Sequence, residues 1–421
     1  MNSLEQDAEA KDNPVTVRQA PDKDRVYWPQ LDGLRSIAFL MVYMSHLVPL
    51  KLPETDSFAN HVVIFINTAF SWGWIGVELF FVLSAFLITT LLLQERAKYG
   101  QISFKYFFIR RVLRIWPLYY SFLGLAFLGI PLVGSLYAAP FGSNYWIQTV
   151  KHYLGPSLVF LFNFSLTTDG TYMPSFFQRI HWSVAMEEQF YLVWGLVLFR
   201  VKTTSTLLKI VTLSFLFTIA LRASFILAAH NHHLYYYNTF SHLDSILVGI
   251  LLAIWLAKGK LKVEQVQKFN GPLLWTPVIF YLLLCLFAPP IQSNSPIYII
   301  LFTLIAGFCG SFVLAILHGQ TGKRLFSHPL LVHMGRLTYA MYLFHMLGQQ
   351  IAMTLTEQWA GPITSLSDLY LAWAFYALFG LLLTFFMAFI SWHLLEKGFY
   401  NLRYRFSRIP SGFSEARSTK E

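Results

Sequence analysis

Charged side chains are scarce in this sequence. Asp, Glu, Lys and Arg make up only 12% of its 421 residues, against roughly 25% in an average soluble protein. Hydrophobic residues make up 56% and aromatic residues 18%. A soluble fold of this size has too little interior to bury so much apolar surface. The composition therefore excludes an ordinary soluble domain and predicts a protein that lies largely within a lipid bilayer.

Other absences narrow the possibilities further. The two cysteines, Cys285 and Cys309, each lie within an apolar segment, so neither a disulfide framework nor a metal site is indicated. Residues 1–26 have no apolar core, and we expect a flexible cytoplasmic tail there rather than a cleavable signal sequence. Without an internal repeat, a single membrane domain is expected over residues 27–400, followed by a basic cytoplasmic tail over residues 401–421.

Apolar segments of about 20 residues are long enough to cross the hydrocarbon. They predict an all-α integral membrane protein with about ten transmembrane helices. Segment 152–166 is shorter and is broken by Gly155 and Pro156, so we expect a re-entrant or surface segment there. The expected spans are 31–50, 72–93, 106–130, 182–199, 206–229, 236–257, 273–290, 297–317, 333–353 and 370–395.

The distribution of basic residues supports this count. With the amino terminus inside, 27 of the 31 Lys and Arg residues fall at inner positions, as the positive-inside rule requires. An even number of spans with both termini cytoplasmic explains the pattern. The net charge of +10 is then an inner-leaflet signature, and no nucleic-acid partner is implied.

Polar residues within the expected spans are the candidates for chemistry, because ionisable groups in the membrane are costly. Arg35 and His46 lie eleven residues apart, which places them on one helix face about 16 Å apart. His46 lies in the outer third of the membrane, as do Glu78, Glu187 and three further residues, and together they predict a polar cavity. Those three residues are Glu188, Asp244 and Arg222.

The segment FFIRRVLRIWPLYY gives a second group of basic residues at the inner end of its span. Arg111 and Arg114 are neighbours on one helix face, with Arg35 on the same side of the membrane. Such a pair suits a phosphate group, although a cytoplasmic anchor that follows the positive-inside rule is the other interpretation.

Several aromatic and histidine side chains also have two interpretations. Tyr342 and His345 follow i, i+3 spacing, for which aromatic packing is the default and a place in the cavity the alternative. Trp182 suits stacking on a sugar ring, but tryptophan is equally typical of the membrane interface.

Seven motifs occur in an order that resembles the membrane acyltransferase 3 family. Its members are acyl-CoA-dependent O-acyltransferases of bacterial surface polysaccharides, lipopolysaccharide and peptidoglycan. Two positions depart from the family pattern, Ala85 in place of glycine and His242 in place of arginine. The motifs are LDGLRSIAFLMVYMSH (31–46), GWIGVELFFVLSAFLIT (73–89), RRVLRIWPLYY (110–120), HWSVAMEEQFYLVWG (181–195), LDSILVGILLA (243–253), MGRLTYAMYLFH (334–345) and LLEKGFY (394–400).

The resemblance and the expected layout together imply a multi-pass protein of the bacterial cytoplasmic membrane. Its co-substrate would be acyl-CoA, with acetyl-CoA expected, and no permanently bound cofactor is implied. The phosphates would lie near Arg111, Arg114 and Arg35 at the inner face. The acceptor would be a hydroxyl of a carbohydrate or glycolipid at the outer face.

The same reasoning assigns catalytic roles. His46 would act as general base on the acceptor hydroxyl, oriented by Glu78 or Glu187, with an acyl-histidine intermediate as the alternative. Arg35, Ser84 or a backbone amide would stabilise the oxyanion. The substrate pocket would be completed by Ser84, Trp182, Glu188, Asp244, Tyr342 and His345.

A secondary transporter is the competing function, because charged residues at mid-membrane depth also mark proton or solute paths. A transporter more often contains an inverted repeat, and none stands out in this sequence. Acceptor identity, acyl chain length and oligomeric state are not determined by the sequence.

Overall fold

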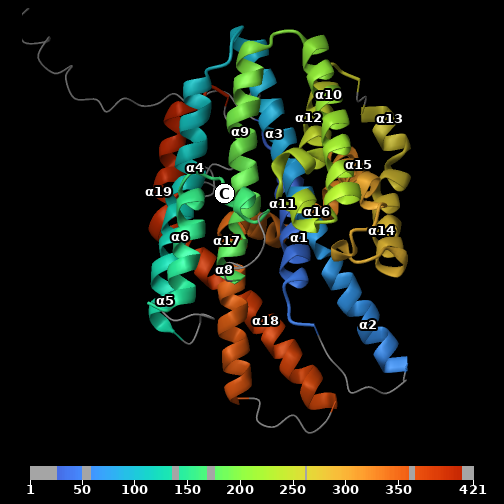
Figure 1. The fold of residues 1–421 in the computed structure, drawn as a ribbon. Helices are drawn as coiled ribbons and strands as arrows, with labels where there is room; N and C mark the ends of the chain where they lie inside the picture. Colours follow the sequence, from blue (N-terminus) through green and yellow to red (C-terminus); the bar gives the residue numbers. More distant parts are fainter. Residues whose placement is uncertain are drawn as a thin grey trace, which may run out of the picture.

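The computed structural model describes residues 26–49, 58–134, 142–167, 176–260, 263–359 and 366–409. Of the predicted tails, residues 1–25 and 410–421 lie outside these ranges, whereas residues 26 and 401–409 are described. The fold is all-helical, as predicted (Figure 1). The helices are α1 (Pro29–Ser45), α2 (Phe58–Ser71), α3 (Ile75–Tyr99), α4 (Phe104–Gly124), α5 (Ile130–Val133), α6 (Asn144–Leu158), α7 (Phe162–Ser165), α8 (Phe176–Arg179), α9 (His181–Arg200), α10 (Thr204–Ser224), α11 (His232–Tyr237), α12 (Asp244–Ala257), α13 (Val263–Lys268), α14 (Asn270–Phe287), α15 (Tyr298–His318), α16 (Gln320–Phe326), α17 (Pro329–Trp359), α18 (Leu366–Ser391), α19 (Lys397–Leu402) and the 3₁₀ turn η8 (Arg403–Phe406).

Local signals explain where several helices begin and end. Ser103, Ser143 and Thr203 cap α4, α6 and α10, because each side-chain oxygen accepts a hydrogen bond from a backbone N–H in the first turn. Gly100 ends α3 in the left-handed conformation, with φ of 73°, which glycine adopts without strain. The cap at Ser103 matters for the site, because it fixes the start of the helix that carries Arg110, Arg111 and Arg114.

Among the described residues, six helical segments are long and apolar enough to cross a membrane. The chain is therefore a multi-pass membrane protein. Four other expected spans coincide with α1, α9, α12 and α17, which are shorter or more polar, so the count of ten stays a prediction. The six segments are His61–Tyr99, Phe104–Val133, Thr204–Ala229, Asn270–Phe287, Tyr298–His318 and Ser367–Phe406.

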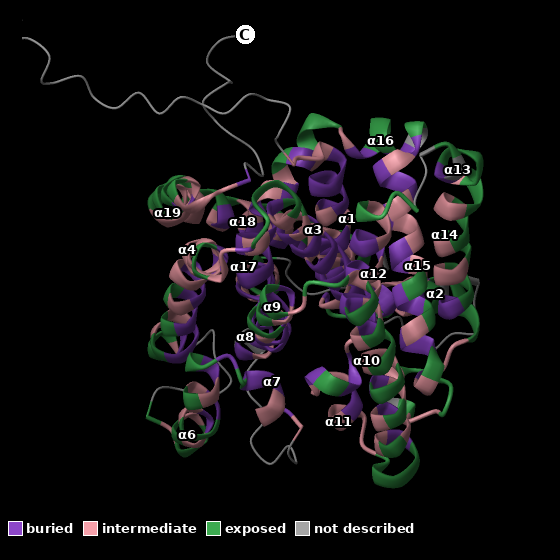
Figure 2. Cartoon of the chain, turned by 90° about the horizontal axis from the view of Figure 1, so that it is seen from above, coloured by how far each residue is buried: buried purple, intermediate pink, exposed green. Residues whose placement is uncertain are grey.

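The buried core lies around α1, α3 and α17. Figure 2 shows buried residues concentrated on these central helices, whereas α13 and α14 at the periphery are mostly exposed. Large apolar side chains such as Leu213, Phe217 and Leu282 are exposed on the peripheral helices. A bilayer accounts for these apolar outer faces, because lipid tails solvate them as well as a protein core does.

Glycines bring α1 into backbone contact with its neighbours. A Cβ atom at Gly335 of α17 would lie 1.9 Å from the carbonyl oxygen of Asp32, and one at Gly76 of α3 would lie 2.2 Å from that of Ala38. No side chain fits into either space. Close approach of this kind is typical of membrane helices that carry small residues at their interfaces, and it fixes α1 between α3 and α17.

We expect Gly335→Ala to lower the free energy of unfolding by about 1–3 kcal/mol, because the added methyl group would push α1 away from α17. The thermal unfolding midpoint of the purified protein in detergent measures the effect. Gly307→Ala in α15 is the matched control, since its Cβ would meet nothing within 4 Å and alanine favours the helix. Equal losses in both variants would contradict the close contact.

Candidate active site

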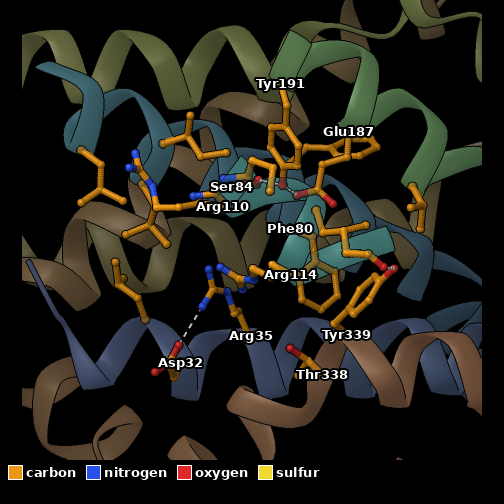
Figure 3. A pocket seen from close by; sticks show the side chains of 18 of the residues that line it. Asp32, Arg35, Phe80, Ser84, Arg110, Arg114, Glu187, Tyr191, Thr338 and Tyr339 are labelled. Carbon is orange, nitrogen blue, oxygen red and sulfur yellow. Dashed lines mark hydrogen bonds and ion pairs between the residues drawn. The ribbon is translucent and has the colours of Figure 1, made fainter. Parts of the chain in front are cut away.

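A pocket lies among α1, α3, α4, α9 and α17, and η8 supplies part of its wall. Figure 3 shows Arg35, Arg110 and Arg114 toward one side of it, with Glu187 and Tyr339 toward the other. Five arginines line the pocket, and they come from three separate stretches of the chain. They are Arg35, Arg110, Arg111, Arg114 and Arg403.

Only two of the five arginines form an ion pair with a carboxylate in the described part of the chain. Arg35 pairs with Asp32 at 2.7 Å and Arg110 with Glu95 at 3.6 Å. The remaining three leave a local excess of positive charge, which a ligand with several negative charges would neutralise. Burial and the Asp32 carboxylate raise the pKa of Tyr27 above its ordinary value, so this pocket-lining phenol stays protonated.

Hydrogen-bonded hydroxyl groups line the middle of the pocket. Tyr191 donates to the Glu187 carboxylate, and its hydroxyl lies 2.7 Å from Ser84 Oγ. The hydroxyl groups of Ser183 and Tyr342 lie 2.5 Å apart. These five side chains link α3, α9 and α17 along the pocket wall and offer donors and acceptors for an extended polar ligand.

Two histidines meet one turn beyond Tyr342. His345 Nδ1 lies 2.5 Å from the Tyr342 carbonyl oxygen, and His46 Nδ1 lies 2.8 Å from that of Val42. Because a carbonyl oxygen only accepts, both Nδ1 atoms carry protons. His345 Nε2 then faces His46 Nδ1 at 3.3 Å. In the neutral ring, Nε2 of His46 carries the lone pair, which is the arrangement that a general base needs.

The pocket and the histidine pair are joined by ring contacts. The Tyr342 ring, which lines the pocket, has its centroid 5.6 Å from that of His345, and the His345 centroid lies 5.1 Å from that of His46. A cationic pocket thus leads to within one helical turn of a histidine pair.

A family model described as an acyltransferase domain matches residues 28–406 of this chain. The chain belongs to this acyltransferase family. The resemblance that the motifs carry is thereby confirmed, and the matched range includes every residue predicted for the site.

Curated relatives are consistent with the family. A Staphylococcus aureus protein whose name describes an O-acetyltransferase is 30% identical over 332 residues, or 76% of this chain and 50% of that protein. The peptidoglycan O-acetyltransferase OatA of Listeria monocytogenes is 27% identical over 339 residues, or 76% of this chain and 49% of that protein. The chain thus spans about half the length of these curated relatives. No solved structure matches it.

In this acyltransferase the predicted partner of His46 needs correction. Neither Glu78 nor Glu187 contacts His46, whose ring faces His345 instead. Glu78 is buried and engages His242 Nε2 at 2.5 Å and Ser245 Oγ at 2.6 Å. Similar depth along two helices did not bring His46 and Glu78 together, because the Glu78 side chain faces α12.

The predicted ring of ionisable groups is not one cavity. Asp244 forms a two-pronged, fully buried ion pair with Arg222, at 2.5 and 3.1 Å, and also accepts a hydrogen bond from Thr303. Glu188 accepts a hydrogen bond from Trp116 Nε1 at 3.1 Å. Neither Asp244 nor Glu188 is among the residues that line the arginine-rich pocket, so a substrate-pocket role for either stays a prediction.

Trp182 also lies outside this pocket. Its ring packs against those of Tyr236, at 5.1 Å between centroids, and Tyr237, at 5.4 Å, so it is a packing residue in this structure. Arg35 lines the pocket three turns from His46 and pairs with Asp32, and its oxyanion role stays a prediction.

Several pocket-lining residues were missed from the sequence, among them Tyr191, Ser183 and Arg403. Tyr191 follows Glu187 by four positions and so shares its helix face. This spacing could have predicted that Tyr191 belongs to the same site as Glu187. Ser183 lies within the 181–195 motif, but no further signal marked it. Arg403 falls in the predicted basic tail, yet it is only 9% exposed, and ordered structure extends beyond the predicted domain boundary at residue 400.

Proposed function

We propose that this chain transfers an acyl group, expected to be acetyl, from acyl-CoA bound in the arginine-rich pocket to a hydroxyl of a carbohydrate or glycolipid acceptor. One observation carries the proposal. The pocket combines an excess of guanidinium groups with a wall that leads toward the His46–His345 pair, and acyl-CoA combines phosphates with a long arm that ends in a thioester.

The pocket suits the donor at both ends. Arg111 and Arg114, together with Arg35, supply cations for the phosphates. Toward Tyr342, the hydroxyl and carboxylate groups of Ser84, Glu187 and Tyr191 match the amide groups of the pantetheine arm. We propose that the arginine-rich end faces the cytoplasm, where acyl-CoA is made, in a bacterial cytoplasmic membrane with both chain termini inside.

His46 then performs proton transfer. Its Nε2 takes the proton of the acceptor hydroxyl as that oxygen forms a bond to the thioester carbon. The carbon–sulfur bond breaks, and the departing CoA thiolate takes the proton from the imidazolium, so that the enzyme is regenerated. The His46 Nδ1–H donates to the Val42 carbonyl oxygen and also faces the neutral Nε2 of His345; the two acceptors orient the ring and stabilise its charged form, as the orienting partner does in a catalytic triad.

The named activity of the relatives supports a glycan acceptor. The peptidoglycan O-acetyltransferase OatA acts, by its name, on peptidoglycan. For this chain we propose a surface glycan or its lipid-linked precursor on the face of the membrane opposite the donor pocket.

Inverted membrane vesicles test the proposal. Radiolabelled acetyl-CoA is supplied at the exposed cytoplasmic face, and label is followed into alkali-labile esters of glycans in the vesicle interior. We expect labelled ester only when the chain is present. Intact acetyl-CoA inside the vesicles, with no labelled ester, would favour a transporter and contradict the proposal.

Arg114→Ala is expected to raise the Michaelis constant for acetyl-CoA by about tenfold, because it removes a charge-assisted contact to a phosphate worth roughly 1.5 kcal/mol or more. The turnover number at saturating donor should change much less. Arg200→Ala, at the exposed end of α9, is the control and should leave both constants unaltered. An unchanged Michaelis constant in Arg114→Ala would argue against phosphate binding at this end.

A further inference from the structure

The segment after the last long helix lies against the donor pocket. Arg403, Tyr404 and Ser407 line the pocket together with residues from α1, α3, α4, α9 and α17. Figure 1 shows α19, which leads directly into this segment, beside α4. The segment is therefore a wall of the site and not a free tail.

A buried carboxylate holds this wall in place. Glu95, whose side chain is 1% exposed, pairs with Arg110 at 3.6 Å and with Arg408 at 3.8 Å. Arg110 also donates to the Phe406 carbonyl oxygen at 2.6 Å, and Tyr99 donates to that of Arg408 at 3.1 Å. The ends of α3 and α4 thus fix the backbone of residues 406–408.

The Arg403 side chain is oriented by stacking. Its guanidinium carbon lies 3.7 Å from the centroid of the Tyr400 ring and 5.3 Å from that of Tyr404. These ring contacts orient the guanidinium, Tyr404 takes one of its hydrogen bonds, and the planar group has further N–H donors for phosphate oxygens. No carboxylate forms an ion pair with Arg403 among the described residues. An anionic ligand would therefore supply the negative charge that balances this guanidinium.

The order of groups along the pocket indicates which anion this is. Arg111 lies over the Tyr191 ring at 5.4 Å, next to the polar groups that face the acyl arm. In acyl-CoA the diphosphate adjoins that arm, whereas the 3′-phosphate sits on the ribose at the far end. Arg403 contacts the rings of Tyr400 and Tyr404, and its segment is held by Arg110 and Glu95; we assign this wall to the far end of the ligand.

We propose that Arg403 binds the 3′-phosphate of the acyl-CoA donor and that residues 403–407 form the nucleotide-binding wall of the site. The inference rests on the proposed function, because it takes acyl-CoA as the donor. It adds a specificity determinant, a contact that separates CoA from its 3′-dephosphorylated form.

Calorimetric titration of the purified full chain with CoA and with dephospho-CoA tests the proposal. In Arg403→Ala, affinity for CoA should fall about tenfold, while affinity for dephospho-CoA stays at the wild-type value. Arg405→Ala, on the same turn but exposed, should bind both ligands as wild type does. Arg403→Lys keeps a cation without the stacked fork and should lie between the two.

The outcomes separate this inference from the proposed function. Binding of CoA by the wild type, with equal affinity in Arg403→Ala, would overturn the role of Arg403 and leave the donor assignment standing. Equal losses for CoA and dephospho-CoA would overturn the 3′-phosphate assignment. If neither the wild type nor any variant bound CoA, the proposed function itself would fail.

Discussion

His46→Ala is expected to lower the rate of acetyl transfer by about 10²- to 10⁴-fold, the contribution of a positioned general base. Alanine removes the Nε2 lone pair that would accept the hydroxyl proton, while α1 stays helical through Ser45. The measurement is the initial rate of label incorporation into glycan ester, in vesicles that contain equal amounts of protein. Affinity for CoA should be unchanged, because Arg35 lies three turns away on α1 and His46 is not among the residues that line the arginine-rich pocket.

Two histidine variants serve as controls. His393→Ala removes an exposed ring in the last long helical segment, whose Nδ1 lies 2.9 Å from the Phe389 carbonyl oxygen, and should leave the rate unaltered. His345→Ala should fall between the two, since His46 would lose its acceptor partner but keep the Val42 carbonyl contact. Transfer at more than half the wild-type rate in His46→Ala would contradict its catalytic role.

Asp244→Asn should destabilise the fold by about 3–5 kcal/mol, the usual effect of removing one partner of a buried ion pair. Asp244 and Arg222 are both completely buried, and the same carboxylate accepts a hydrogen bond from Thr303. The substitution would leave an uncompensated guanidinium between α10, α12 and α15. The fraction of protein that stays monodisperse after heating in detergent measures the loss.

A double variant distinguishes the charge from the packing. Replacing Arg222 by methionine and Asp244 by leucine together removes both charges and keeps most of the volume, so stability should recover substantially relative to Asp244→Asn. Glu264→Gln, at an exposed position in α13, controls for loss of a carboxylate and should have little effect. A double variant less stable than Asp244→Asn would show that packing, not charge balance, dominates there.

The helices were largely predictable from the sequence. Runs of about 20 apolar residues can satisfy their backbone hydrogen bonds in lipid only as helices, and each expected span coincides with a helix. Spans with many polar residues were harder to judge. The α9 helix contains Glu187 and Glu188, so composition alone does not decide whether it crosses the membrane.

The site was predictable only in part, because sequence gives the depth of a side chain but not its direction around the bundle. The depth argument correctly placed Arg35 with Arg111 and Arg114. It failed for Glu78, whose direction is decided by the packing of α3 on α12. The contribution of Arg403 was hidden for another reason, since a basic residue after the last span is the ordinary expectation of the positive-inside rule.

The glycine contact that fixes α1 against α17 also fixes the relative positions of the site residues that these two helices carry. Arg35 and His46 belong to α1, and Tyr342 and His345 belong to α17, so one part of the arginine-rich pocket and the histidine pair are positioned by the same two helices. The segments α6 to α8 and α11 lie outside that pair. Under the proposed function, substitutions there would leave the placement of His46 beside His345 unchanged.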